Sequence, residues 1–542
     1  MHFAQLVFHG GTVLTADGPI TTAVAVRGNL IAAVGAGARE LIGPATEVVD
    51  LAGGLLAPGF QDAHIHPVGG GLNSLRVDLL GLSGAPAYLA AVAAYATAHP
   101  DRPWITGGGW AMADFPGGLP TAPALDAVVA DRPVLLHNRD CHGAWANTRA
   151  LELAGITERT PEPPDGRIER GPGNRPTGML HEGAVDLVTA LIPPPTRAER
   201  LAALRFAQRH LHSLGITAWQ DAILGDFGSL PDASADYAEL AARGELTARV
   251  TGALWWQRDR GLEQIEELRE RRDRLSSDRF RATSVKIMQD GVAENFTASM
   301  LEPYLADCPH PHGLSFVDPA MLHQAVAALD ADGFHLHFHA IGDRAVRDVL
   351  DAVEHARAAN EAWDRRHHIA HVQVVNPADL PRFAALDVTA TIQPLWATNE
   401  PQMTELTLPI LGPGRAAHQY SFAGLRRAGA RLAAGSDWPV SRPDPLWGIH
   451  VAVNRTLPAR DPDHDPEPFL PGERLTPLEA LTAYTAGSAH VNNLGGTGTI
   501  APGNLADLVV LDRDILTEPV DTIADARVLR TYVDGDLVFH AR

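Results

Sequence analysis

The chain has 542 residues, 45% hydrophobic and 20% charged, which is enough for a large domain and a smaller one. Its 44 basic and 65 acidic residues give a formal net charge of −21, which argues against nucleic acid or an anionic membrane surface as the main partner. The only cysteines, Cys141 and Cys308, exclude a disulfide framework and a cysteine-based zinc site.

The N-terminal stretch 1–18 has neither a basic segment nor a continuous apolar one, so we expect no signal peptide. No run of apolar residues is long enough to predict a membrane-spanning helix. These features favour a cytoplasmic enzyme that acts on a small-molecule substrate.

Both ends of the chain are rich in short β-like runs separated by turns. The N-terminal runs are broken by Gly and Asp-Gly, which is typical of hairpins. The C-terminal runs ADLVVLD, ARVLRTYVDG and DLVFHAR have the same pattern. We therefore predict a small composite β-sandwich domain formed by residues 1–57 and 495–542.

Between these ends, short apolar strands alternate with helical stretches, which indicates βα units around a parallel sheet. We expect eight strands, near 56–65, 216–221, 248–255, 283–289, 334–339, 368–372, 388–393 and 431–436. Helices are expected at 199–213, 261–275, 318–331, 343–359 and 377–385. The predicted fold class is α/β, with residues 58–494 forming a (β/α)8 TIM-type barrel.

The first two predicted strands are separated by roughly 150 residues, far more than an ordinary βα connection requires. We therefore predict a large insertion after strand one, at about 70–210. It is expected to stand over the active site.

A histidine pair ends the first predicted barrel strand, in the sequence Gln-Asp-Ala-His-Ile-His. Residues two apart on a strand face the same side, so His64 and His66 can share one metal ion. Barrel enzymes keep their catalytic groups at this end of the strands, which favours a metal site over two surface histidines.

Two further predicted strands end in histidine. The stretch Phe-His-Leu-His-Phe-His places three histidines on one face, and His339 lies nearest the carboxyl end, where a ligand is expected. His335 is better explained as a satisfied interior histidine, and for His337 both explanations stay open. In the sixth strand, its position at the strand end favours His371 as a ligand.

The last predicted strand ends at Asp437, where a buried carboxylate needs a cation or hydrogen-bond donors to offset its desolvation. Strand four carries Lys286 between apolar residues, a costly position for a lysine that is neither neutral nor paired. One explanation is an ion pair with an interior carboxylate. The other is a neutral lysine carbamylated by carbon dioxide, which bridges two metal ions. Nitrogen and oxygen ligands of this mixture suit zinc, with iron, manganese or nickel as alternatives.

The insertion and the barrel loops supply further candidates. His142 is a candidate catalytic residue that contacts the substrate or its oxyanion, although a solvent-facing loop position explains it equally well. Three tryptophans are candidates for the wall of an apolar substrate pocket, although tryptophans in such loops often serve only packing. They are Trp110, Trp396 and Trp438.

These stretches together make the sequence similar to the amidohydrolase superfamily, in the branch (amidohydrolase family 3) that includes N-substituted formamide deformylase. The barrel stretches that match are PGFQDAHIHP, VKIMQDGV, HFHAIGDRAV, IAHVQ and GSDWPV. Others are WITGGGW and HNRDCHGAWANTRAL in the insertion, and LTPLEALTAYTAGSA and GTIAPGNLADLVVLD near the C-terminus. Gln61 departs from the family, which usually has an apolar residue there.

The resemblance implies a barrel with a composite β-domain and a metal centre holding one or two divalent ions, zinc first. It places the ligands at His64, His66, Lys286, His339, His371 and Asp437. It also favours a carbamylated Lys286, and a homodimer is the family's common state.

The reaction that the resemblance implies is hydrolysis of an amide, N-acyl or N-formyl C–N bond by metal-activated water. Asp437 would act as the proton shuttle between this water and the departing amine. A cyclic-amide hydrolase and a deaminase are the alternatives on the same scaffold, but such a deaminase typically has an H-x-x-E pattern that HFHAIGDRA lacks. A non-catalytic ligand-binding protein is a further alternative, but it would not need Lys286 and Asp437 together.

Overall fold

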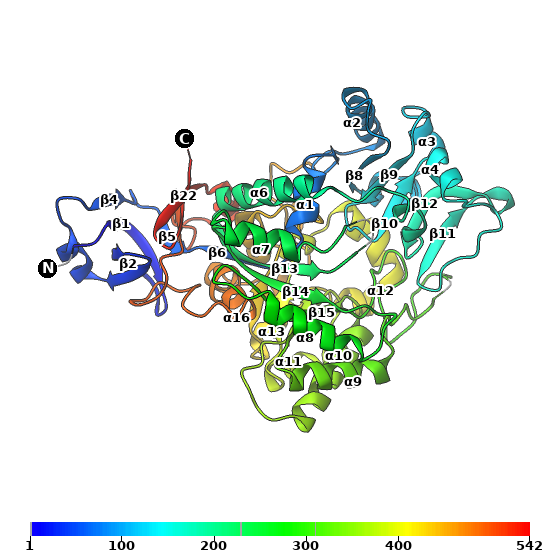
Figure 1. The fold of residues 1–542 in the computed structure, drawn as a ribbon. Coiled ribbons are helices and arrows are strands. Elements are labelled where there is room, and N and C mark those ends of the chain that lie inside the picture. Colours follow the sequence, from blue (N-terminus) through cyan, green and yellow to red (C-terminus); the bar gives the residue numbers. More distant parts are fainter. Residues whose placement is uncertain (1–2, 228–229, 309, 542) are drawn as a thin grey trace.

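Eight parallel strands form the central sheet of the computed structural model, which describes residues 3–227, 230–308 and 310–541 (Figure 1). Their spatial order, β19-β18-β17-β16-β15-β14-β13-β6, is the reverse of their order in the chain, so strands that follow one another in this sheet are neighbours. The strands are β6 (Phe60–Ile65), β13 (Ile216–Leu224), β14 (Arg249–Trp255), β15 (Phe280–Met288), β16 (His335–Ala340), β17 (His368–His371), β18 (Thr389–Ile392) and β19 (Leu432–Ala434).

The first and last strands of this sheet meet through the residues at their carboxyl ends. The backbone N–H of Asp437 donates to the carbonyl of His64 at 2.8 Å, and that of His66 to the carbonyl of Trp438 at 2.9 Å. The sheet therefore curls into a nearly closed barrel, which confirms the predicted barrel architecture. The same two bonds bring the ends of strands one and eight together.

Helices follow the strands around the outside of the barrel (Figure 1). On α10, Val346, Val349, Leu350 and Val353 are buried at helical spacing, which packs one face of the helix against the sheet. The helices are α6 (Arg197–Ser213), α7 (Ser234–Ala242), α8 (Gln264–Arg274), α9 (Pro319–Ala331), α10 (Asp343–Ala359), α11 (Leu380–Ala385), α12 (Leu408–Ala416), α13 (Phe422–Arg427), α14 (Pro445–Asn454), α15 (Pro477–Thr482) and α16 (Ser488–Val491). Five of them coincide with the predicted helices. No helix in the described part of the chain is long and apolar enough to cross a membrane.

The predicted first strand, 56–65, is in fact two strands that belong to different sheets. β5 (Leu55–Pro58) pairs with a strand from the C-terminal end of the chain, and β6 begins the barrel. Gly59 separates them, and a Cβ atom there would lie 2.3 Å from the side chain of Thr217. A side chain at this position would clash, so glycine allows the chain to pass from one sheet to the other.

Strands from both ends of the chain share one sheet, and Figure 1 shows the blue N-terminal strands and the red β22 in the same region of the molecule. Its members are β1 (Leu6–Thr15), β2 (Gly18–Arg27), β3 (Leu30–Val34), β4 (Glu47–Asp50), β5, β20 (Leu508–Leu511), β21 (Val528–Val533) and β22 (Asp536–His540). The sandwich form of this region and the domain boundaries stay predictions.

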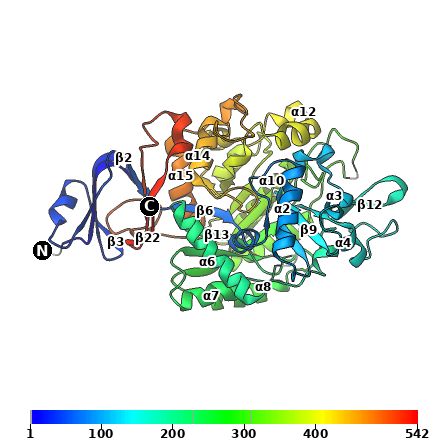
Figure 2. The ribbon, with the colours of Figure 1, turned by 90° about the horizontal axis from the view of Figure 1, so that it is seen from above.

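The segment between β6 and α6 contains a third, smaller sheet with the order β11-β12-β10-β9-β8-β7 (Figure 2). The sequence predicts an insertion here but not this sheet. The strands are β7 (Val77–Asp78), β8 (Ile105–Trp110), β9 (Val134–Asn138), β10 (Gly143–Ala146), β11 (Gly166–Arg170) and β12 (Pro176–Glu182). The helices are α1 (Pro67–Asn73), α2 (Ala85–Ala98), α3 (Ala122–Asp126), α4 (Thr148–Leu153) and α5 (Asp186–Thr189).

Candidate active site

A cavity of about 910 Å³ lies at the carboxyl ends of the barrel strands. All six expected metal ligands line it, together with residues of the insertion such as Arg139 and His142. Barrel enzymes place their chemistry at this end, and pockets of this volume hold small-molecule substrates.

The histidine pair of strand one meets the aspartate of strand eight inside this cavity. Nε2 of His64 lies 3.3 Å from Oδ1 of Asp437, and Nε2 of His66 lies 3.0 Å from the same oxygen. Their ligand atoms fall within 4.8 Å of one another, a spacing that one metal ion can bridge. The backbone bonds that close the barrel hold this cluster together.

Burial alone would raise the pKa of Asp437. The nearby imidazoles of His64 and then of His66 favour the ionised carboxylate, outweigh burial and bring the pKa well below its ordinary value. Asp437 also has a left-handed backbone conformation, with φ +57°, as does His371, with φ +79°. Such conformations cost about 1–3 kcal/mol each and gather at functional sites. Here they turn two strand-end side chains into the cavity.

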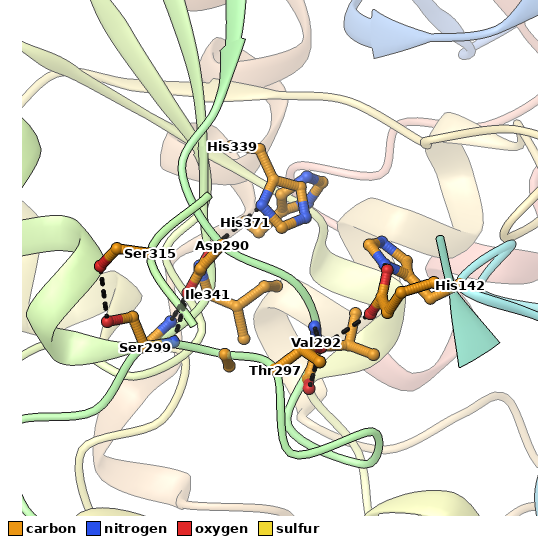
Figure 3. A network of polar contacts seen from close by, with 12 residues as sticks. His142, Asp290, Val292, Thr297, Ser299, Ser315, His339, Ile341 and His371 are labelled. Carbon is orange, nitrogen blue, oxygen red and sulfur yellow. Dashed lines mark hydrogen bonds and ion pairs between the residues drawn. The ribbon is translucent and has the colours of Figure 1, made fainter. Parts of the chain in front are cut away.

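His339 and His371 lie side by side on neighbouring strands, with ring centroids 4.4 Å apart. Nδ1 of His371 donates to Oε1 of Gln393 at 3.1 Å. Nδ1 of His339 donates to Oδ1 of Asp290 at 3.2 Å (Figure 3). Because a neutral imidazole has one N–H, these bonds leave Nε2 of both rings with a lone pair for a metal.

Asp290 anchors His339 to the backbone of the neighbouring loops. Its carboxylate also accepts N–H groups from Ile341 at 3.0 Å, Gly342 at 2.8 Å and Ser299 at 2.9 Å (Figure 3). A carboxylate held in this way fixes the orientation of the histidine that donates to it.

Lys286 lies on β15 with 3% of its surface exposed, and it lines the cavity. Within the described residues no carboxylate forms an ion pair with it, and its polar contact is Nε2 of His337 at 3.4 Å. Burial lowers the pKa of Lys286 to about 7, although the charge of Asp437 opposes this shift. The geometry therefore favours a neutral amine over the ion pair that sequence analysis left open.

Composition adds to this interpretation, because Lys286 is the only lysine in the chain, beside 43 arginines. Arginine cannot replace lysine in chemistry that needs a neutral amine, since its guanidinium stays charged. The only lysine in the chain thus occupies a position at which the charged guanidinium of arginine could not supply a neutral amine.

His142 reaches the same cavity from the insertion. Its ring centroid lies 5.6 Å from that of His339, and its Nδ1 lies 2.9 Å from Oε2 of Glu182. Thr297 donates to Glu182 at 2.7 Å, which links the insertion to the loop after β15 (Figure 3). Burial opposes a positive charge on His142, but Glu182 outweighs it and raises the pKa of His142 to about 9. His142 is thus partly buried, lines the cavity and is held by Glu182.

The three candidate tryptophans differ in position. Trp396 lines the cavity and stacks on His371, with ring centroids 5.2 Å apart. Trp110 is fully buried among the rings of the insertion and donates to the carbonyl of Leu136 at 2.8 Å. Trp438 packs on His210. Neither Trp110 nor Trp438 lines the cavity. Both pack inside the protein instead of forming the expected wall of the substrate pocket.

Sequence reasoning missed the residues that hold the expected ligands in place. They are Glu182, Asp290 and Gln393. His337, for which the sequence leaves both explanations open, contacts His64. Asp290 and Gln393 follow their strands within two residues, which is the one signal that the sequence offers for them. His335 lies inside the fold against Trp363, as expected for an interior histidine, but its Nδ1 has no hydrogen-bond partner among the described residues.

The donor set fits a divalent metal ion. Oδ1 of Asp437 is buried and lacks a well-aligned hydrogen bond from any described residue, although two imidazole nitrogens lie within 3.3 Å of it. A buried carboxylate oxygen of this kind needs a cation. Imidazole and carboxylate ligands of this number suit zinc.

The family model described as amidohydrolase family matches residues 47–539. The chain belongs to the amidohydrolase family. This confirms the resemblance drawn from the barrel motifs and supports a hydrolytic function that uses a divalent metal.

Individual proteins are similar to this one over nearly the whole chain. LONG AFTER FAR-RED 3 of Arabidopsis thaliana is 33% identical over 552 residues, covering 99% of this chain and 92% of that protein. N-substituted formamide deformylase of Arthrobacter pascens is 27% identical, covering 95% and 94%. The crystal structure of an uncharacterized metal-dependent hydrolase from Pyrococcus furiosus has a TM-score of 0.70 at 26% identity, covering 94% of this chain and all of that one. The cytoplasmic location and the homodimer stay predictions.

Proposed function

We propose that this amidohydrolase uses one or two divalent metal ions to cleave the C–N bond of a small amide, N-acyl or N-formyl compound. Zinc is the first candidate for the metal. The observation that carries the proposal is the cluster of His64, His66 and Asp437, with Lys286 lining the same cavity. The formamide deformylase among the relatives supports an N-formyl amine as one substrate class.

A bound divalent ion would lower the pKa of a water molecule and polarise the scissile carbonyl of the substrate. The carboxylate of Asp437, which lines the cavity beside His64 and His66, would act as the base that takes a proton from the attacking water and returns it to the departing amine. With a pKa of about 9, His142 is protonated at neutral pH, and its Nδ1 is held by Glu182. Its Nε2–H is then free to donate to the negative charge that develops on the carbonyl oxygen.

We further propose that Lys286 carries a carbamate that supplies an oxygen ligand. Its burial, its lowered pKa and the lack of a paired carboxylate among the described residues support a nucleophilic amine. Its status as the sole lysine makes the modification unusually easy to assign.

Lys286→Ala is expected to lose activity and to recover part of it with short-chain carboxylic acids, which replace the missing carboxylate. In wild-type protein labelled with ¹³C-bicarbonate, NMR should show one lysine carbamate. Lys286→Arg is the control, because it keeps a long basic side chain but cannot form the carbamate, so it should lack both the signal and the activity. Fully active wild-type protein with no such signal would contradict the proposal and favour a single-metal site.

The charge of the cavity wall narrows the substrate class. Twelve aspartate and glutamate side chains line the cavity, against four arginine and lysine side chains. A concave wall of one dominant charge concentrates ligands of the opposite sign and repels those of the same sign. We therefore propose that the substrate is neutral or cationic beyond its scissile bond.

The test is a panel of N-formyl and N-acetyl benzylamines that differ only in a para substituent. The neutral parent and the para-aminomethyl compound should be hydrolysed with at least about tenfold higher kcat/KM than the para-carboxylate, and salt should narrow the gap. Preference for the para-carboxylate would contradict the charge argument. Failure of the zinc-loaded protein to hydrolyse any N-acyl compound would contradict the proposed function itself.

A further inference from the structure

One buried histidine joins two of the expected metal ligands. Nε2 of His337 lies 2.8 Å from Nδ1 of His64 and 3.4 Å from Nζ of Lys286. His337 on β16 is the register partner of Lys286 on β15, so both side chains lie at the same level of the barrel. A single ring nitrogen therefore contacts residues from two other strands, directly beneath the cavity.

The chemistry of the three groups fixes which of them donates. Nε2 of His64 faces Oδ1 of Asp437 at 3.3 Å, and a neutral imidazole that binds a metal through Nε2 carries its proton on Nδ1. Nδ1 of His64 then donates to His337. Nζ of Lys286 keeps a hydrogen both as an amine and as a carbamate, so it donates to the same nitrogen. His337 is thus the shared acceptor.

The barrel interior holds the ring of His337 in the orientation that this role requires. The ring packs on His368, with centroids 4.1 Å apart. His368 is fixed in turn by Oγ1 of Thr391 at 2.8 Å and Oε1 of Gln220 at 3.0 Å. Nδ1 of His337 has no hydrogen-bond partner within the described part of the chain, so Nε2 makes all of its polar contacts there.

We propose that His337 is a positioning residue of the metal centre. It keeps Nε2 of His64 turned towards Asp437, and it holds Nζ of Lys286 at the same point. Hydrogen bonds of this kind orient metal-binding histidines, and their loss typically weakens metal binding by about 10–100-fold. The inference rests on the proposed function only in taking the centre to bind a divalent ion.

The test measures zinc affinity by competition with a chelator, which requires no substrate. His337→Asn shortens the side chain so that it no longer reaches His64, and zinc affinity should fall by about 10–100-fold. His337→Gln keeps an oxygen acceptor near the position of Nε2 and should bind zinc nearly as tightly as the wild type. His335→Gln is the matched control, because His335 lies on the same face of the same strand but packs on Trp363.

Circular dichroism of the metal-free proteins checks folding, and His337→Ala serves as a second truncation if the asparagine variant does not fold. Wild-type zinc affinity in the truncated variants would overturn the inference while leaving the proposed function standing. Equal losses in His335→Gln and His337→Gln would also overturn it, because they would show general damage to the barrel interior. A wild-type protein that binds no divalent ion would refute the proposed function, and the inference with it.

Discussion

Replacing both His64 and His66 with alanine is expected to abolish metal binding and activity without unfolding the barrel. Their Nε2 atoms are the two nitrogens nearest to Oδ1 of Asp437, so the variant keeps at most one member of the cluster. The fold should survive because the barrel closes through backbone bonds of residues 64 and 66, which alanine retains. Elemental analysis after gel filtration measures the bound metal, and circular dichroism checks the fold.

The matched control is the double variant His323→Ala/His355→Ala. These histidines also stack on each other, with ring centroids 5.4 Å apart, but they lie on α9 and α10 outside the cavity. The control should keep its metal and its activity. Full metal content in the His64/His66 variant would remove these residues from the ligand set, and the proposed metal centre would then have to be built from other side chains.

The strand ends that form the site could be predicted because two local rules coincide there. An apolar run predicts a buried strand, and a histidine or aspartate directly after it lies at the mouth of a parallel barrel. His64, His339, His371 and Asp437 all follow this pattern, and the structure places all four around one cavity. The break at Gly59 does carry a turn signal, the Pro58-Gly59 pair, but this pair does not show that the strands on its two sides belong to different sheets.

The residues that orient the ligands could not be predicted, because their contacts join segments distant in the chain. Glu182 belongs to the insertion, yet it contacts Thr297 in a loop of the barrel. A single polar residue next to a strand belongs to no periodic pattern, so the sequence does not predict which residue it contacts. Trp110 illustrates the same limit, because its position in the sequence does not show whether its ring faces the cavity or the core of the insertion.

Asp437→Asn is expected to keep the metal but to lower kcat by roughly 10²–10⁴, the usual contribution of general acid–base catalysis. Asparagine retains the size of aspartate and one oxygen that can act as a ligand, but it cannot accept a proton from water. Metal content, measured together with kcat, separates the loss of a proton shuttle from the loss of a ligand.

The pH–rate profile gives a second, independent readout of the same role. The pKa of Asp437 is held well below its ordinary value, against the effect of burial, by His64 and His66. The carboxylate is therefore ionised across the neutral range, and activity should fall only in acid, where it becomes protonated. In Asp437→Asn this acidic limb should disappear or move, because the group that titrates is gone. Near-native turnover in this variant would leave Asp437 as a structural ligand. His142, held by Glu182 on the same cavity, would then be the first residue to test as the group that moves the proton.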